Sequence, residues 1–85
     1  MEKQEIIEIL KAENKDAALE VLSAYADNFI DYQEAVENIS EQGAIVAHPK
    51  NGAPIDNPYL KIRDSAQNNM RKCRLKTNKL WELRK

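Results

Sequence analysis

The sequence predicts a mainly α-helical fold: a helical hairpin of two long helices, with a short N-terminal helix before them and a small β-hairpin between them. Apolar residues recur at every third or fourth position over most of the chain, which is the spacing of helices buried on one side. Both glycines, Gly43 and Gly52, lie in the middle, where turn-forming residues gather. The chain has 85 residues, so we expect one domain, residues 1–85, with a thin core that favours oligomers.

A short amphipathic helix is expected over residues 2–13. Ile6, Ile7 and Leu10 lie at helical spacing among charged residues. The turn that follows contains Asp16, whose carboxylate can cap the free backbone N–H groups of the next helix. The sequence therefore predicts two helices here, separated by a short break.

The long helix expected over residues 17–42 has the clearest pattern. Its apolar residues step by four and three positions through three heptads, which keeps one seam in line along the helix. Gly43 is the residue type favoured just beyond a helix end. We expect the seam to pair with the last helix or with another subunit, and its predicted members are Leu22, Tyr25, Phe29, Tyr32, Val36 and Ile39, with Ile62 and Met70 from the last helix.

A β-hairpin is expected over residues 44–56. Asn51-Gly52 can supply the two positive φ angles that a tight two-residue turn requires. Asn57 and Pro58 then suit a helix start, because asparagine accepts a free backbone N–H and proline at the first helical position loses no hydrogen bond. The β-hairpin would thus sit where the two long helices meet.

The last expected helix covers residues 58–84 and is either continuous or broken near residues 76–77. Residues 1–60 contain four basic and twelve acidic side chains, a net charge of −8, whereas residues 61–85 contain nine basic and two acidic side chains, a net charge of +7. A cationic surface attracts nucleic acid or an acidic protein surface. Composition leaves both interpretations open, and the acidic partner can be this chain or a neighbouring subunit.

The residue types argue against an enzyme or a metal protein. Cys73 is the only cysteine and His48 the only histidine, so neither an internal disulfide nor a zinc-type Cys/His spacing can form. The two glycines do not make a phosphate-binding loop. We expect no catalytic residues, no metal and no cofactor, with Cys73 as a small buried hydrophobic residue and His48 in an exposed loop.

The chain shows no sign of export or of membrane insertion. It opens with charged residues where a signal peptide needs a basic start and an apolar run, and it contains no stretch of about 20 apolar residues. We expect a soluble protein of a reducing intracellular compartment, with no membrane partner.

Leu80 and Trp81 form an apolar pair near the end of the chain. On a helix they would lie on adjoining faces, flanked by basic residues. Trp81 can fold back to fill the thin core, which we favour, or it can anchor in a groove of a partner protein, as tryptophan often does at interfaces. Both roles stay open at this point.

Three motifs resemble the P-twenty-seven-like phage terminase small subunits, over a region from about Leu19 to Leu75. Tyr32, Ala35 and Ile39 match a helix motif that ends in a glycine, here Gly43. An Asn-Pro-x-Leu motif then opens a helix at residues 57–60, and that helix carries Met-Arg at residues 70–71. The family often continues with Gly-Leu-Thr-Pro, whereas residues 74–77 here read Arg-Leu-Lys-Thr, without the glycine and the proline.

The resemblance implies a non-catalytic component of phage DNA packaging in the cytoplasm of the bacterial host. Such a protein would bind double-stranded phage DNA, form a homo-oligomer and regulate the ATPase and nuclease of the terminase large subunit. The alternative is a structural or adaptor module whose basic helix binds acidic protein surfaces. Charge and spacing, rather than the family, suggest which side chains would contact DNA phosphates or base edges: Arg63, Asn68, Asn69, Arg71, Lys72, Arg74, Lys76 and Lys79.

Overall fold

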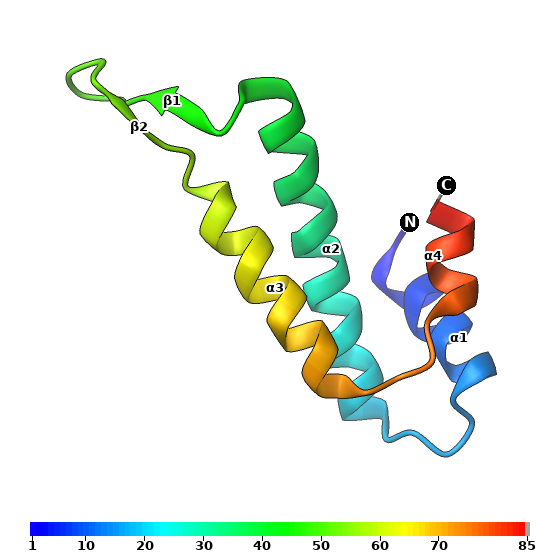
Figure 1. Ribbon diagram of the computed structural model, residues 1–85. Helices are drawn as coiled ribbons and strands as arrows, with labels where there is room; N and C mark the ends of the chain where they lie inside the picture. Colours follow the sequence, from blue (N-terminus) through cyan, green and yellow to red (C-terminus); the bar gives the residue numbers. More distant parts are fainter. Residues whose placement is uncertain (85) are drawn as a thin grey trace.

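The computed structural model describes residues 1–84 and is mainly helical, as predicted. Two long helices run antiparallel, a β-hairpin joins them, and two shorter helices lie together beside the other end of the pair (Figure 1). We call the end with the short helices the base and the end with the β-hairpin the tip. The elements are α1 (Lys3–Glu13), α2 (Leu19–Gln42), β1 (Ile45–Ala47), β2 (Pro54–Asp56), α3 (Tyr59–Cys73) and α4 (Asn78–Arg84).

The apolar core lies at the base, where all four helices meet. Phe29 of α2 is its largest fully buried side chain. At helical spacing, Ile6 and Leu10 turn the same face of α1 toward α2, which explains why this short helix docks rather than frays. The buried cluster comprises Ile6, Leu10, Leu22, Tyr25, Ala26, Phe29, Met70 and Leu80.

The last helix of the base, α4, closes this core with an aromatic contact. The indole of Trp81 meets Phe29 edge to face, with ring centroids 4.8 Å apart, and meets Tyr32 at 5.8 Å. Its Nε1–H donates a hydrogen bond to the Tyr25 hydroxyl at 2.9 Å. Leu80 is fully buried beside it. The sequence therefore placed Trp81 correctly in favouring the core.

The tip is held by a polar residue instead of an apolar cluster. Asn57 is buried, and its side-chain amide donates hydrogen bonds of 2.9 Å to Asn38 Oδ1 and to the Gly43 carbonyl. Its side-chain oxygen accepts the Tyr59 backbone N–H at 2.9 Å. Pro58 already has helical backbone angles, so Asn57 acts as the predicted cap of α3 while also joining α3 to the end of α2.

The β-hairpin forms where expected, but its turn differs from the prediction. Val46 pairs with Ile55 at the centre of the two strands. The turn spans residues 49–52, and among them only Gly52 has a positive φ, of 73°. The expected two-residue turn with two positive angles was wrong, because the N–H of Gly52 bonds to the His48 carbonyl and closes a wider loop.

The basic C-terminal helix is broken, so the continuous alternative over residues 58–84 was wrong. The first part ends at Cys73, and Arg74 takes a left-handed conformation with φ 52°. Glycine is the residue type favoured at such a helix end, because it adopts a positive φ without strain. The expected Asp16 cap is also wrong, since α2 begins after Ala18 with no side-chain cap.

Candidate nucleic-acid interface

Five cations lie close together where α3 ends and α4 begins. We call residues 71–79 the basic elbow, because the chain turns there and the segment contains no acidic residue. All five side chains are exposed, and none forms an ion pair within residues 1–84. The elbow thus presents concentrated positive charge to the solvent, from Arg71, Lys72, Arg74, Lys76 and Lys79.

Residues at the end of α1 fix the path of the elbow. Asn14 exchanges two hydrogen bonds of 2.8 Å with the backbone N–H and carbonyl of Lys76. The Glu13 carboxylate accepts the backbone N–H of Lys79 at 2.7 Å and so caps the start of α4. These contacts leave the lysine side chains free to point outward while their backbone is held. No local sequence pattern indicates this pairing, which joins residues more than sixty positions apart.

Two lysines extend the basic elbow along the outer face of α3, where the exposed Asp64 interrupts the positive charge between Lys61 and Asn68. Lys61, Asn68 and Lys72 are spaced by seven and four residues, so they share one helix face, and all three are exposed. Ala66 and Met70, on the opposite side, are buried against α2. Sequence reasoning missed Lys61, although its heptad spacing to Asn68 could have revealed it.

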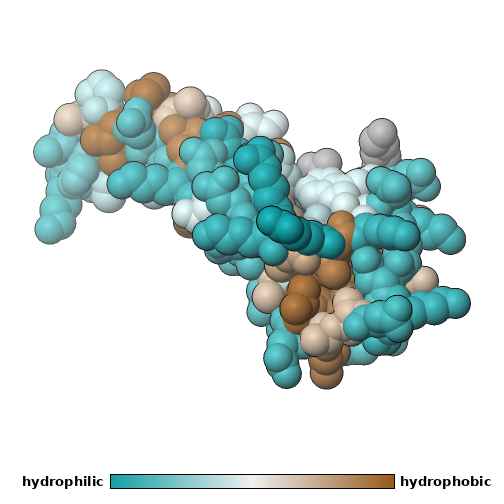
Figure 2. Space-filling view, turned by 60° about the horizontal axis from the view of Figure 1, so that its bottom comes forward, coloured by the Kyte–Doolittle hydropathy of each residue, from teal (hydrophilic) through white to brown (hydrophobic). Residues whose placement is uncertain are grey.

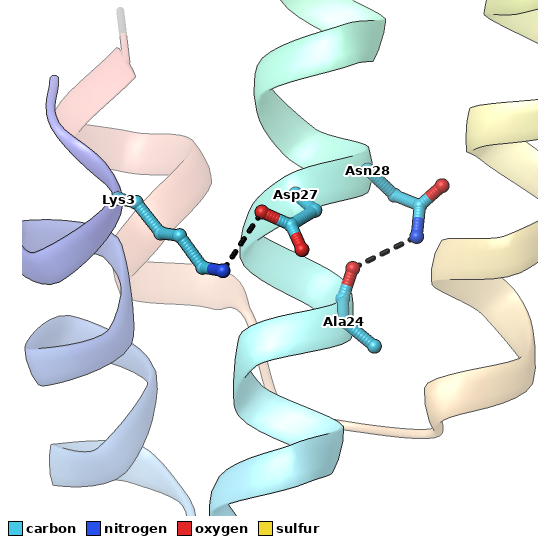
Figure 3. Close-up of polar contacts among 4 residues, drawn as sticks. All are labelled: Lys3, Ala24, Asp27 and Asn28. Atoms are coloured by element: carbon cyan, nitrogen blue, oxygen red, sulfur yellow. Dashed lines mark hydrogen bonds and ion pairs between the residues drawn. The ribbon is translucent and has the colours of Figure 1, made fainter.

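Two predicted DNA-contacting residues are engaged within the chain. Arg63 Nε lies 3.2 Å from Oδ1 of the adjacent Asp64, in an exposed ion pair. Asn69 donates a hydrogen bond of 3.2 Å to Asn28 Oδ1 of α2. Asn28 in turn donates to the Ala24 carbonyl, as Figure 3 shows. These two residues have less freedom to contact DNA than the cations of the elbow.

One acidic side chain of α2 forms an ion pair that joins α2 to α1 at the base. Lys3 of α1 forms an ion pair of 3.0 Å with Asp27, and both side chains are half exposed (Figure 3). Such an exposed pair contributes about 0–1 kcal/mol to folding. Within residues 1–84 no ion pair joins the acidic side chains of α2 to the cations of α3, although Asp31 and Lys61 line one shallow pocket between the two helices.

A pocket of about 250 Å³ opens beside the elbow, between α2, α3 and α4. Met70, Leu75 and the rings of Tyr25 and Trp81 supply apolar walls. Its polar groups are Gln67, Arg71, Arg74 and Thr77. We call this cavity the base pocket.

The predicted seam divides between the two ends of the molecule. Leu22, Tyr25, Phe29 and Met70 are buried in the core, where they pair the helices. Tyr32, Val36 and Ile39 are half-buried, and Ile62 is 41 % exposed. Burial of Leu80 and of part of Trp81 means that a partner-anchor role would require α4 to leave the core.

The remaining candidate residues show no reactive environment. Partial burial raises the pKa of the Cys73 thiol, which lowers its thiolate fraction at neutral pH, and Cys73 Sγ lies 3.4 Å from the Asn69 carbonyl oxygen. Within residues 1–84 no three His, Cys, Asp or Glu side chains gather as metal ligands. None of the helices in that range combines the length and apolar character needed to cross a membrane.

The fold and this surface define a small, mainly helical protein with a concentrated cationic face. A model of the family described as phage terminase, small subunit, matches residues 3–76. The chain belongs to this family, whose function is in phage DNA packaging and whose members are generally the non-catalytic component of the terminase. The P-twenty-seven-like branch stays a prediction. Searches among curated proteins and among solved structures returned no match.

Proposed function

We propose that this protein is the DNA-recognition and regulatory subunit of a phage packaging motor, acting in the host cytoplasm as a homo-oligomer with a large ATPase and nuclease subunit. Membership of the terminase small-subunit family supports this role. The single observation that points to DNA is the basic elbow, with five exposed cations in nine residues and no acidic residue among them.

The physical basis of DNA binding would be contact with phosphates. Lysine and arginine side chains that neutralise phosphates release bound counterions, so affinity falls steeply as salt rises. The elbow and the outer face of α3 would supply these contacts, chiefly from Lys61, Lys72, Lys76 and Lys79. Base-edge contacts would come from Asn68, Arg71 or Arg74, whose donor and acceptor groups suit purines.

Titration of a labelled duplex from the packaging region, followed by fluorescence anisotropy at several salt concentrations, tests this proposal. The variant Lys72→Gln/Lys76→Gln removes two exposed cations of the elbow. We expect weaker binding. We also expect the slope of log affinity against log salt concentration to become shallower by about 1 for each lysine that contacts a phosphate.

The matched control is Lys15→Gln/Lys50→Gln, which changes net charge equally at exposed positions outside the elbow. It should bind almost as the unaltered protein does. Equal losses of DNA affinity in both variants would mean that net charge, and not the position of the elbow cations, determines binding. Absence of binding by the unaltered protein at low salt would contradict the proposal and favour the adaptor alternative, in which the elbow docks on an acidic protein.

A further inference from the structure

We propose that the β-hairpin of one copy docks in the base pocket of a second copy, through Ile45 and Asp56 on one side and Arg71 and Arg74 on the other. This inference rests on the homo-oligomer in the proposed function and names the two surfaces that would form it. Each surface carries an apolar part and a charge, and the two charges are opposite.

The β-hairpin presents one exposed face that nothing in the same chain covers. Ile45 is a direct cross-strand partner of Asp56, and Ala47 of Pro54, so these four side chains share a face. All four are exposed, with Ile45 at 58 %. Val46 and Ile55, on the opposite face, are half-buried. An isoleucine with a carboxylate directly opposite it fits a cavity that is apolar inside and cationic at its rim.

The base pocket has that character. Its walls include Met70, Leu75 and Trp81, and its cations are two exposed arginines with no ion pair within residues 1–84. A guanidinium can bind a carboxylate through two parallel hydrogen bonds, which makes arginine well suited to hold Asp56. The volume of about 250 Å³ accepts a single aliphatic side chain and would not enclose the whole hairpin.

The two surfaces lie at opposite ends of an elongated molecule, so they cannot meet within one chain. The molecule measures 50 × 23 × 17 Å, and Figure 2 shows apolar side chains gathered at the hairpin end and again at the base, with hydrophilic side chains between them. A contact between different surfaces on successive copies is head-to-tail. Such contacts close into rings or extend as filaments, according to the rotation between copies.

The apolar walls favour a second protein copy over DNA as the occupant of this pocket. A phosphate group has no apolar part and binds best to open cationic surface, whereas Ile45 would remove apolar surface from water on both sides. If Arg71 and Arg74 hold Asp56 of a neighbour, they are not available to bases, so phosphate contacts fall to the lysines of α3 and of the elbow and base-edge contacts fall to Asn68. Assembly and DNA binding then use adjacent but different cations.

Two single substitutions, studied alone and mixed, test the interface. Ile45→Asp replaces the apolar side chain of the hairpin face with a charge and leaves the pocket unchanged. Arg74→Glu reverses a charge of the pocket and leaves the hairpin unchanged. In sedimentation-velocity experiments on the full chain, each variant alone should self-associate at least about tenfold more weakly than the unaltered protein. An equimolar mixture should form pairs, because one intact hairpin then meets one intact pocket.

Two further variants serve as controls. Leu83→Asp introduces the same charge at a leucine that is 62 % exposed and lies outside both surfaces, so it should assemble normally. The double variant Asp56→Arg/Arg74→Glu exchanges the charges within one chain and should regain association lost by Arg74→Glu. Circular dichroism confirms that each variant is folded.

The inference is overturned if the unaltered protein is monomeric at its highest soluble concentration, or if Ile45→Asp or Arg74→Glu assembles normally. It is also overturned if the mixture stays monomeric, or if the exchanged double variant stays as weak as Arg74→Glu. If the unaltered protein assembles through these surfaces but binds no DNA, the proposed function is contradicted and this interface is supported. If the unaltered protein binds DNA as a monomer, the interface is contradicted and DNA binding is supported.

Discussion

At the base of the molecule, apolar side chains from all four helices pack around Phe29, whereas at the tip one buried asparagine joins the end of α2 to the start of α3. The base removes large apolar groups from water, which is the main favourable contribution to folding. The tip relies on a few hydrogen bonds, each of which contributes modestly. Stability is therefore concentrated at the base, and the β-hairpin projects from the less stable end.

In the two proposals, the base would contact DNA and also provide the pocket for a neighbouring copy, whereas the tip would provide only the docking hairpin. The basic elbow is part of the stable end, since Asn14 and Glu13 hold its backbone against α1. Cations fixed to a rigid base lose less entropy when they bind a phosphate backbone than cations on a mobile tail. The tip, which contributes little to the core, is free to meet another subunit.

The largest expected effect comes from Phe29→Ala. Removing this fully buried ring leaves a cavity among all four helices and should lower the free energy of unfolding by about 3–5 kcal/mol. Urea denaturation followed by circular dichroism measures the change. Leu19→Ala is the control, because Leu19 is 67 % exposed and its truncation should change stability by less than about 0.5 kcal/mol. Equal effects at the two sites would contradict a core centred on the base.

A smaller effect is expected at the tip from Asn57→Ala. The substitution removes the cap of α3 and both donor hydrogen bonds, which should cost about 1–3 kcal/mol. The comparison variant Asn57→Asp keeps an acceptor for the Tyr59 N–H and loses the donors. Because its carboxylate would face the Asn38 and Gly43 oxygens in a buried site, we expect Asn57→Asp to be at least as destabilised as Asn57→Ala in urea denaturation at neutral pH. A loss from Asn57→Ala as large as that from Phe29→Ala would mean that the tip and the base contribute equally to stability.

The smallest effect is expected at the elbow, from Arg74→Gly. The left-handed conformation of Arg74 costs a non-glycine residue about 1 kcal/mol. Glycine avoids this cost, but its greater freedom in the unfolded chain offsets part of the gain in stability. The variant should therefore be as stable as the unaltered protein, or more stable by up to about 1 kcal/mol. Arg74→Ala is the control, since it removes the same side chain without relieving the backbone. If Arg74→Ala were more stable than Arg74→Gly, loss of the arginine side chain, and not relief of the backbone angle, would account for the change in stability.

Local patterns predicted most of the fold. The long helix α2, its end before Gly43 and the Asn57-Pro58 start of α3 all depend on neighbouring residues, and the structure has each of them. For Trp81 the sequence left two roles open, with the core favoured, and in the structure its ring packs against Phe29 of the core.

The parts that the sequence left open or missed depend on contacts between distant residues. The break after Cys73 lacks the glycine and proline that usually mark a helix end, and it is held by Asn14 and Glu13 from the opposite end of the chain. The base pocket likewise needs α4 to turn back, which the chain pattern alone did not decide. Of the candidate site, the cations were predictable from composition, whereas the internal pairs of Arg63 and Asn69 were not.

Hydrogen–deuterium exchange of the full chain, free and with duplex DNA, tests the central claim that the stable, cationic base is the DNA-contacting end. In the free protein we expect slow exchange in α1 and the first half of α2, and faster exchange in the β-hairpin. Added DNA should slow exchange in the basic elbow, residues 71–79, more than in any other segment. Protection confined to the β-hairpin or to the face of α1, with an unchanged elbow, would contradict the claim.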